Sequence, residues 1–273
     1  MVDVVRHYRS DGLTSRILDA LAEAGYSTES IDADTLAGVD EFHLGGRSAT
    51  DEIIEILAGT DPGTVLDVGC GIGGSARTIA SRLGCQVVGI DLTPEFIETA
   101  VELTRLVGLD DRARFRVGSA TELGLEDGSV DSLAMVHVGM NIDDKNALAA
   151  EFARVLTPGG TAVIYDIMRM GDGDLEFPLP WAASPSSSFV ATPQAYVEAL
   201  HWAGFEVQPP ADKTSQVLSV ISSAAEQPAP PVNLGHLMGS GFPSMFANLM
   251  GSVRSSDVAP MLLVARAPAA DVG

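Results

Sequence analysis

The sequence predicts an α/β protein with a parallel sheet of seven strands and helices on both faces of that sheet. Short apolar runs alternate with amphipathic segments along most of the 273 residues, which is the pattern of strands joined by helical crossovers. A glycine-rich turn, "VGCGIGG", follows the first of these strands, at the edge where such sheets bind ligands. Hydrophobic residues make up 46% of the chain and charged residues 19%, so the chain can bury a substantial core.

The first elements are two helices. Residues 13–25 carry apolar side chains at helical spacing and end at Gly25, a natural helix stop. A second helix is expected over residues 49–57, after "GGRS". We therefore expect an N-terminal helical cap at residues 1–50 and one α/β domain at residues 51–273. The paired helices of the cap are also a candidate surface for a homodimer.

The central part alternates strands and helices. Five strands are expected at "TVLDVG", "CQVVGID", "ARFRVG", "VDSLAMVH" and "TAVIYDI". Helices are expected over residues 73–83, from the Thr93 cap with Pro94 in the first helical position, and over residues 143–156. A turn is expected at "TPGG", just before the fifth strand.

The C-terminal part contains two irregular segments. Residues 168–192 are rich in Pro and Ser and carry aromatic side chains, so they form either a substrate-binding loop or a loop packed on its own core. A capped helix, "TPQAYVEALHWAG", and a strand, "FEVQP", follow. Residues 228–252 are rich in Met and Gly and are expected to form a lid insertion before the last strand, "APMLLVARA".

The charge balance limits the partners. The formal net charge is −21, from 37 acidic against 16 basic residues, and this field repels both phosphate backbones and anionic membranes. No apolar stretch approaches the ~20 residues needed to cross a bilayer, and Asp3, Arg6 and His7 interrupt the start of the chain. We expect a cytoplasmic protein that acts on a small molecule, with no nucleic acid and no membrane as partner.

The glycine loop is a ligand site in either of two interpretations. It matches G-x-G-x-x-G through Gly69, Gly71 and Gly74, and also acid-x-G-x-G-x-G through Asp67, Gly69, Gly71 and Gly73. Both patterns let the backbone approach an anionic or nucleotide-like ligand at a helix N-terminus. The loop by itself therefore leaves open whether it binds a dinucleotide or another nucleoside.

Five motifs in order resolve this ambiguity. "FHLGG", "VLDVGCGIGG", "GIDLTPEFIETA", "FRVGSATEL" and "FARVLTPGG" resemble the motifs of class I S-adenosylmethionine-dependent methyltransferases, in the branch of the sterol, tocopherol and ubiquinone-type enzymes. The resemblance covers about residues 40–168. It implies a Rossmann-like fold, S-adenosylmethionine as cofactor, and methylation of a small metabolite on carbon or oxygen. Two alternatives remain: a protein that binds this cofactor without methyl transfer, and an NAD-linked oxidoreductase.

The resemblance also implies the cofactor residues. Asp67 and the loop backbone are expected to hold the methionine end, and Asp91 the ribose hydroxyls. Ser119 stands where the family commonly has Asp, so its contact with the adenine amino group would be a neutral hydrogen bond. The full expected set is His43, Asp67, Gly69, Cys70, Gly71, Gly73, Asp91, Leu92, Ser119, Ala120, Thr121 and His137.

The chemistry beyond the cofactor depends on three candidate catalytic residues. His137 ends the fourth strand and either acts as a base or lines the pocket. With Asp166, which ends the fifth strand, and His236 of the lid, it is a candidate site for a divalent metal ion that would assist C-methylation of a 2-oxo acid. The alternative is three unrelated polar residues. The expected substrate contacts are Arg47, which either pairs with a substrate carboxylate or caps a helix, and Met140, Asn141, Trp181 and Phe189.

Overall fold

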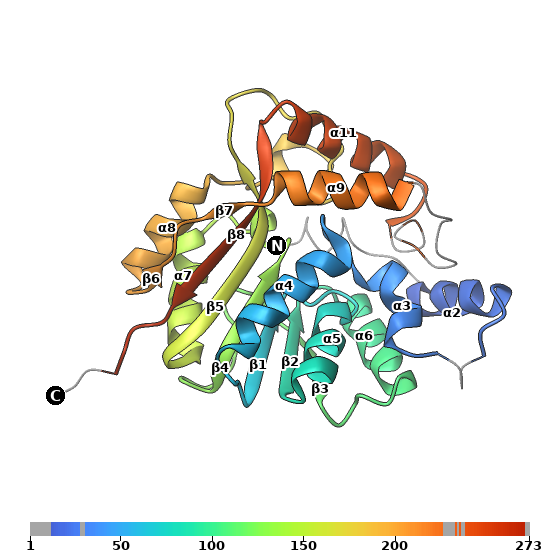
Figure 1. Cartoon of the computed structure of the whole chain (residues 1–273), viewed down its shortest axis with the longest axis horizontal. Helices are drawn as coiled ribbons and strands as arrows, with labels where there is room; N and C mark the ends of the chain where they lie inside the picture. The colour runs from blue at the N-terminus through green and yellow to red at the C-terminus, as the bar shows by residue number, and fades with distance from the viewer. Residues whose placement is uncertain (1–11, 28–30, 226–232, 234, 236–237, 271–273) are drawn as a thin grey trace.

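The computed structural model describes residues 12–27, 31–225, 233, 235 and 238–270. Its centre is a mixed sheet of eight strands, in the order β3-β2-β1-β4-β5-β8-β6, with β7 paired to β8. The strands are β1 (Thr64–Val68), β2 (Gln86–Asp91), β3 (Ala113–Val117), β4 (Val130–Val136), β5 (Leu156–Arg169), β6 (Glu206–Val207), β7 (Ala211–Asp212) and β8 (Val258–Arg266). The predicted α/β class, with helices on both faces of the sheet, is confirmed (Figure 1).

The sheet is parallel only from β1 to β5. β8 inserts beside β5 in antiparallel register, from Thr161 opposite Arg266 to Arg169 opposite Val258. Both β6 and β7 are also antiparallel to β8. The parallel arrangement expected for the alternating strands therefore holds from β1 to β5. The strands after them are antiparallel, which the sequence does not indicate because the apolar run of β8 has the same pattern in either direction.

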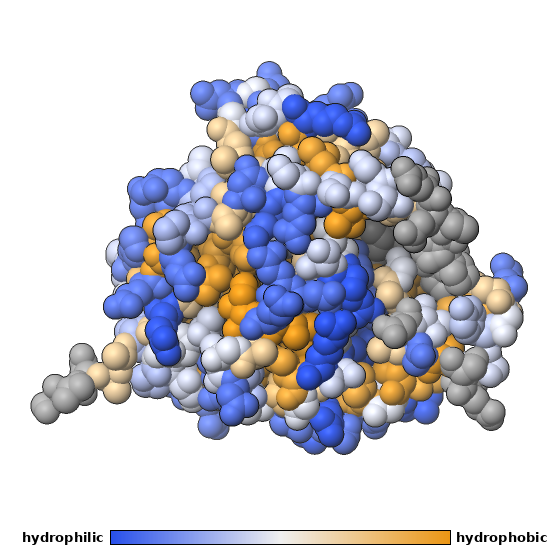
Figure 2. All heavy atoms as spheres, viewed as in Figure 1, coloured by the Kyte–Doolittle hydropathy of each residue, from blue (hydrophilic) through white to orange (hydrophobic). Residues whose placement is uncertain are grey.

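Helices cover the two faces. One face carries α4 (Gly46–Ala58) and α5 (Gly74–Leu83), and the other carries α7 (Lys145–Val155) and α8 (Pro193–Trp202). At the β3 edge, α6 (Pro94–Leu106) contacts α2 (Leu13–Glu23). In the face shown in Figure 2, hydrophilic residues run over α4. None of the helices in the described residues is long and apolar enough to span a bilayer.

The N-terminal helices pack on the central domain. The apolar side chains of α2 and α3 (Ala33–Asp40) cluster with Phe96 and Leu103 of α6. The expected boundary at residue 50 lies inside α4, whose Ile53 and Leu57 pack on the sheet. The helix α3 escaped sequence analysis because its eight residues carry little amphipathic pattern.

The segment expected to be a turn at "TPGG" is part of β5. Gly159 takes a positive φ of 75°, and the register with β4 shifts between Val130 and Ser132. Between these two pairs β4 advances two residues, from Val130 to Ser132, while β5 advances five, from Leu156 to Thr161, so the turn residues form an irregularity at the start of β5.

Two helices lie beyond the carboxyl ends of the parallel strands. Figure 1 shows α9 (Thr214–Ala225) and α11 (Phe242–Arg254) side by side at the top of the sheet. Val217 of α9 and Leu249, Met250 and Val253 of α11 are buried against Trp181 of the 168–192 loop and its neighbours. The second half of the expected lid is therefore a packed helix, and residues 226–232, 234, 236 and 237 lie outside the described residues.

Candidate active site

A cavity of about 460 Å³ opens at the carboxyl ends of β1, β2 and β4. It is lined by most of the predicted cofactor residues: His43, Asp67, Gly69, Cys70, Gly71, Asp91, Leu92, Ser119, Ala120, Thr121 and His137. Gly73 is not among the lining residues. A Cβ added to Gly73 would lie within 3 Å of the side chains of Phe115 and Arg77. The cavity wall also includes residues outside the expected set, among them Asp40, Phe42 and Thr93.

The glycine loop is held in shape by β2. The amides of Gly69 and Cys70 both donate to the carbonyl of Ile90, at 2.7 and 3.1 Å. Gly69 and Gly71 adopt positive φ angles of 71° and 52°, which residues other than glycine rarely adopt. The loop thereby turns its backbone toward the cavity.

Asp91 connects the loop to the end of β2. Its Oδ2 accepts from the Gly71 amide at 3.0 Å, and its Oδ1 accepts from the Thr93 amide at 2.8 Å. Each carboxylate oxygen has two lone pairs, so both oxygens retain an acceptor site for a ligand. Burial raises the pKa of Asp91, although these amide hydrogen bonds act to lower it.

Asp67 is a buried acid with an unmet acceptor. Its Oδ2 accepts no hydrogen bond from the residues that the structure describes. Burial, and then the charge of Asp91, raise its pKa to about 7. A buried carboxylate in this state favours a cationic or hydrogen-donating ligand, because such a ligand replaces its lost hydration.

The Ser119 hydroxyl is already engaged. It accepts from the Thr121 amide at 3.2 Å and lies 2.9 Å from the Thr121 hydroxyl. This local turn places the hydroxyl groups of Ser119 and Thr121, both expected in the cofactor set, together on the cavity wall.

His137 lies where the cavity meets the centre of the sheet. Its φ of 55° is positive, and its ring stacks on Tyr165 with centroids 5.5 Å apart and planes 4° apart. Burial, followed by the charge of His43, lowers its pKa well below the ordinary value, so the ring is neutral at pH 7. Its Nε2 is buried without a hydrogen-bond partner among the described residues.

Asp166 does not line this cavity. Its Oδ2 accepts from the Tyr196 hydroxyl at 2.7 Å, and its Oδ1 accepts from the Ile167 amide at 2.9 Å. Burial raises its pKa to about 7. Its observed contacts are thus those of a structural residue, and the described residues contain no group of three His, Cys, Asp or Glu side chains suited to a metal ion. The third expected ligand, His236, lies outside the described residues.

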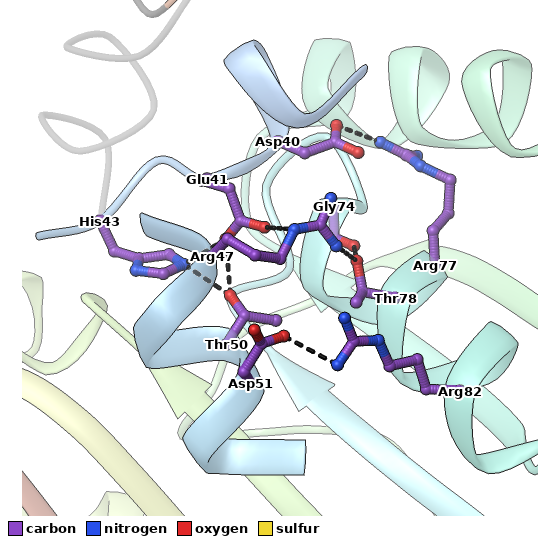
Figure 3. A network of polar contacts seen from close by, with 10 residues as sticks. All are labelled: Asp40, Glu41, His43, Arg47, Thr50, Asp51, Gly74, Arg77, Thr78 and Arg82. Carbon is purple, nitrogen blue, oxygen red and sulfur yellow. Dashed lines mark hydrogen bonds and ion pairs between the residues drawn. The ribbon is translucent and has the colours of Figure 1, made fainter. Parts of the chain in front are cut away.

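A polar network joins the segment after α3 to the helices α4 and α5 (Figure 3). Glu41 lies at its centre, with Oε2 3.0 Å from His43 Nε2 and Oε1 3.3 Å from Arg47 Nε. Arg47, expected at a substrate carboxylate, is thus paired with Glu41 and also donates to the Thr78 hydroxyl at 3.4 Å. Glu41 was absent from the sequence prediction, although it lies two residues before His43 in "EFHLGG".

A second, smaller pocket of about 60 Å³ adjoins the first. Phe42, His43 and His137 line both spaces. The remaining wall of this side pocket is apolar and comes from Leu44, Met140, Pro180, Trp181, Phe242, Phe246 and Leu249. Of the expected substrate contacts, Met140 and Trp181 therefore line the side pocket, whereas Asn141 and Phe189 line the larger cavity.

Comparisons with known proteins agree with this arrangement. Residues 66–164 match the family model of a methyltransferase domain. Over 112 residues the chain is 45% identical to 2-methyl-6-phytyl-1,4-hydroquinone methyltransferase of Synechocystis sp., with 41% of this chain and 34% of that protein covered. Over 138 residues it is 33% identical to methyltransferase GfsG of Streptomyces halstedii, with 50% of each chain covered. The chain thus spans half or less of the length of these relatives.

The fold also matches solved structures. Geranyl diphosphate C-methyltransferase from Streptomyces coelicolor A3(2) superposes with a TM-score of 0.66 at 19% identity, over 97% of this chain and 96% of that chain. At this identity the match concerns the fold alone.

Proposed function

We propose that the protein is a class I S-adenosylmethionine-dependent methyltransferase and transfers a methyl group from this cofactor to a small metabolite. The match of residues 66–164 to the family model of a methyltransferase domain supports this proposal. The observation that carries this proposal is the cavity over the glycine loop, where Asp67 and Asp91 converge. Bound S-adenosylmethionine supplies an electrophilic methyl group on a sulfonium.

The residues present fit this cofactor. Asp67 has a buried acceptor without a partner, which suits the cationic methionine end. Asp91 keeps lone pairs for two ribose hydroxyls. The Ser119 and Thr121 hydroxyls, which contact each other, both belong to residues of the cavity wall, on the side where we place the adenine. The backbone of the glycine loop gives close access without a side chain in the way.

The divalent metal ion expected from sequence has no support in the described residues. Both oxygens of Asp166 accept hydrogen bonds from other groups, and Asp166 is not part of the cavity wall. Asp166 therefore does not fit the role of a metal ligand, on which the expected methylation of a 2-oxo acid depended.

The first test is cofactor binding by Asp91→Asn. The substitution keeps the shape of the side chain but removes the charge that strengthens its hydrogen bonds to the ribose. We expect S-adenosylhomocysteine to bind about 30- to 100-fold more weakly, corresponding to roughly 2–3 kcal/mol, measured by isothermal titration calorimetry.

The matched control is Asp110→Asn, at an exposed position. This variant should bind S-adenosylhomocysteine as tightly as the wild type does. NAD should not displace S-adenosylhomocysteine from the wild type. Equal affinity in Asp91→Asn, or displacement by NAD, contradicts the proposed site. Release of S-adenosylhomocysteine during turnover with a metabolite panel separates a methyltransferase from a protein that only binds the cofactor.

The raised pKa of Asp67 predicts a pH dependence. The pKa of Asp67 in the folded protein, about 7, lies above the ordinary value of 3.8. Protonation of Asp67 therefore contributes fully to the stability of the ligand-free fold below about pH 4. This contribution to stability is lost as the pH rises through 7. A cationic ligand favours the ionised acid. The increase in Tm caused by S-adenosylmethionine should therefore be larger at pH 8 than at pH 6.

Differential scanning fluorimetry at the two pH values measures this difference. In Asp67→Asn the increase should be smaller and nearly the same at both pH values. An undiminished pH difference in that variant would assign the effect to another group.

A further inference from the structure

His43 occupies the boundary between the two spaces of the site. It lines both the cofactor cavity and the apolar side pocket, and its side chain is only 3% exposed. Its ring centroid lies 5.9 Å from that of His137 and 6.1 Å from that of Tyr165. A group entering from the side pocket toward the cofactor therefore passes this imidazole.

The hydrogen bonds of His43 define its tautomer. Its Nε2 lies 3.0 Å from Glu41 Oε2 and 3.1 Å from Thr50 Oγ1, and the Thr50 hydroxyl itself donates to Glu41 Oε2 at 2.5 Å. An ionised carboxylate only accepts hydrogen bonds, so Nε2 carries a hydrogen and the neutral ring has its lone pair on Nδ1. Nδ1 lies 3.5 Å from the Leu44 carbonyl oxygen, which accepts from this nitrogen only when the ring is protonated. In Figure 3 the Nε2 side of the ring faces Thr50 and the other nitrogen faces away from the network.

Glu41 stays ionised in this position. Burial acts to raise its pKa, but the hydrogen bonds and charges of His43, Thr50 and Arg47 outweigh burial and leave the pKa below its ordinary value. The result is a buried carboxylate directly behind an imidazole. Such a partner fixes the orientation of the ring.

His137 lacks a partner of this kind. It stacks on Tyr165, and its Nε2 has no hydrogen-bond partner among the described residues. Burial also raises the pKa of Tyr165, so its phenol stays neutral. Of the two imidazoles at the boundary, His43 is therefore the one that has a carboxylate partner.

The lining of the side pocket indicates which kind of methyl acceptor it can hold. Its wall beyond the two histidines consists of aliphatic, aromatic, Met and Pro side chains, with no charged residue among those described. An apolar body therefore fits it, whereas a carboxylate or an ammonium group would lose its hydration there without compensation. The acceptor atom then lies at the boundary, beside His43.

We infer that His43 is a general base held by Glu41, and that the protein O-methylates an apolar molecule that bears a hydroxyl group. This inference rests on the proposed function. The acceptor oxygen forms a bond to the methyl carbon while the carbon–sulfur bond breaks, and the bonding pair leaves with sulfur as the thioether of S-adenosylhomocysteine. The hydroxyl proton passes to Nδ1 of His43 and from there to solvent. Glu41 is a positioning residue, since it acts through His43.

The test compares two probes that differ only in the acceptor atom, 4-hexylphenol and 4-hexylaniline. Mass spectrometry should identify 4-hexylanisole as the main product. His43→Asn should lower kcat by about 10²- to 10⁴-fold, and Glu41→Gln by about 10-fold or more, with the KM for S-adenosylmethionine within about 3-fold of the wild-type value. Glu41→Asp should recover part of the loss. The control is Asp51→Asn on α4, which removes a contact with Arg82 between two partly exposed side chains and should retain wild-type kcat.

A second measurement does not depend on activity. In ¹⁵N-histidine-labelled protein, the signal that disappears in His43→Asn should show the Nε2–H tautomer. The Nδ1–H tautomer, preferred methylation of the aniline or of a ring carbon, no methylated phenol, or wild-type kcat in His43→Asn each overturns the inference. If S-adenosylhomocysteine still binds in those cases, the cofactor site of the proposed function stands, whereas absence of cofactor binding overturns the proposed function itself.

Discussion

Arg77→Met is expected to lower the free energy of unfolding by about 3–5 kcal/mol. Arg77 is fully buried, and its guanidinium donates to Asp40 Oδ1 at 2.5 Å, to the Ile72 carbonyl at 2.8 Å and to the Thr104 hydroxyl at 3.1 Å. Methionine fills similar volume but leaves the Asp40 carboxylate buried without its counter-ion. Urea unfolding followed by circular dichroism measures the loss.

The same helix supplies a matched control. Arg82 on α5 pairs with Asp51 at 2.9 Å, but both side chains are more than a third exposed, so Arg82→Met should change stability by no more than about 1 kcal/mol. The double variant Asp40→Asn/Arg77→Met should recover part of the loss because no charge remains buried. Equal effects of Arg77→Met and Arg82→Met would show that the buried pair contributes little.

The pH dependence of this loss follows from Asp40. Burial raises its pKa to about 6 even though Arg77 acts to lower it. Without Arg77, protonation of Asp40 becomes the way to avoid an unpaired charge. The cost of Arg77→Met should therefore be smaller at pH 5 than at pH 8.

Gly69→Ala is expected to destabilise the protein by about 2–5 kcal/mol, which combines left-handed backbone strain with overpacking. The φ of Gly69 is 71°, and an added Cβ would lie 2.2 Å from a methyl carbon of Val138. Because Val138 directly follows His137, the substitution should also disturb the cavity wall. Thermal and urea unfolding measure the effect.

Gly71→Ala is expected to affect cofactor binding more than the stability of the fold. Gly71 also has a positive φ, 52°, but its added Cβ meets nothing within 4 Å, so only the strain of about 1–2 kcal/mol remains. Gly71 lines the cofactor cavity, and the new methyl group should weaken S-adenosylhomocysteine binding despite the milder loss of stability. If the two variants are equally destabilised, contact with Val138 is not the reason for glycine at position 69.

The Arg77 prediction also concerns the connection between α5 and the segment that carries His43. Asp40 and Glu41 are consecutive, and they pair with Arg77 on α5 and with His43 and Arg47 around α4. The helix that begins behind the glycine loop is therefore tied to the segment that carries His43 (Figure 3). We expect loss of the Arg77 pair to lower methyl transfer more than its effect on stability accounts for.

The sequence was sufficient for the elements with strong local signals. The apolar runs of β1 to β5, the caps of α6 and α8, and the glycine loop with Asp91 were located correctly, because each depends on residues close together in the chain. The cofactor cavity followed from the same signals, since parallel strands bring their carboxyl ends to one edge.

Only the tertiary structure decided the antiparallel insertion of β8, the packing of α9 and α11 beyond the carboxyl ends of the parallel strands, and the partners of the buried charges. Asp40 and Arg77 are 37 positions apart, and Tyr196 lies 30 positions from Asp166, so no local spacing indicates either pair. For the same reason Asp166 was expected at the reaction centre, whereas in the structure its carboxylate accepts a hydrogen bond from the Tyr196 hydroxyl. Local periodicity determines strands, helices and the glycine loop, whereas the partner of a buried acid depends on which distant side chains packing brings within hydrogen-bond distance.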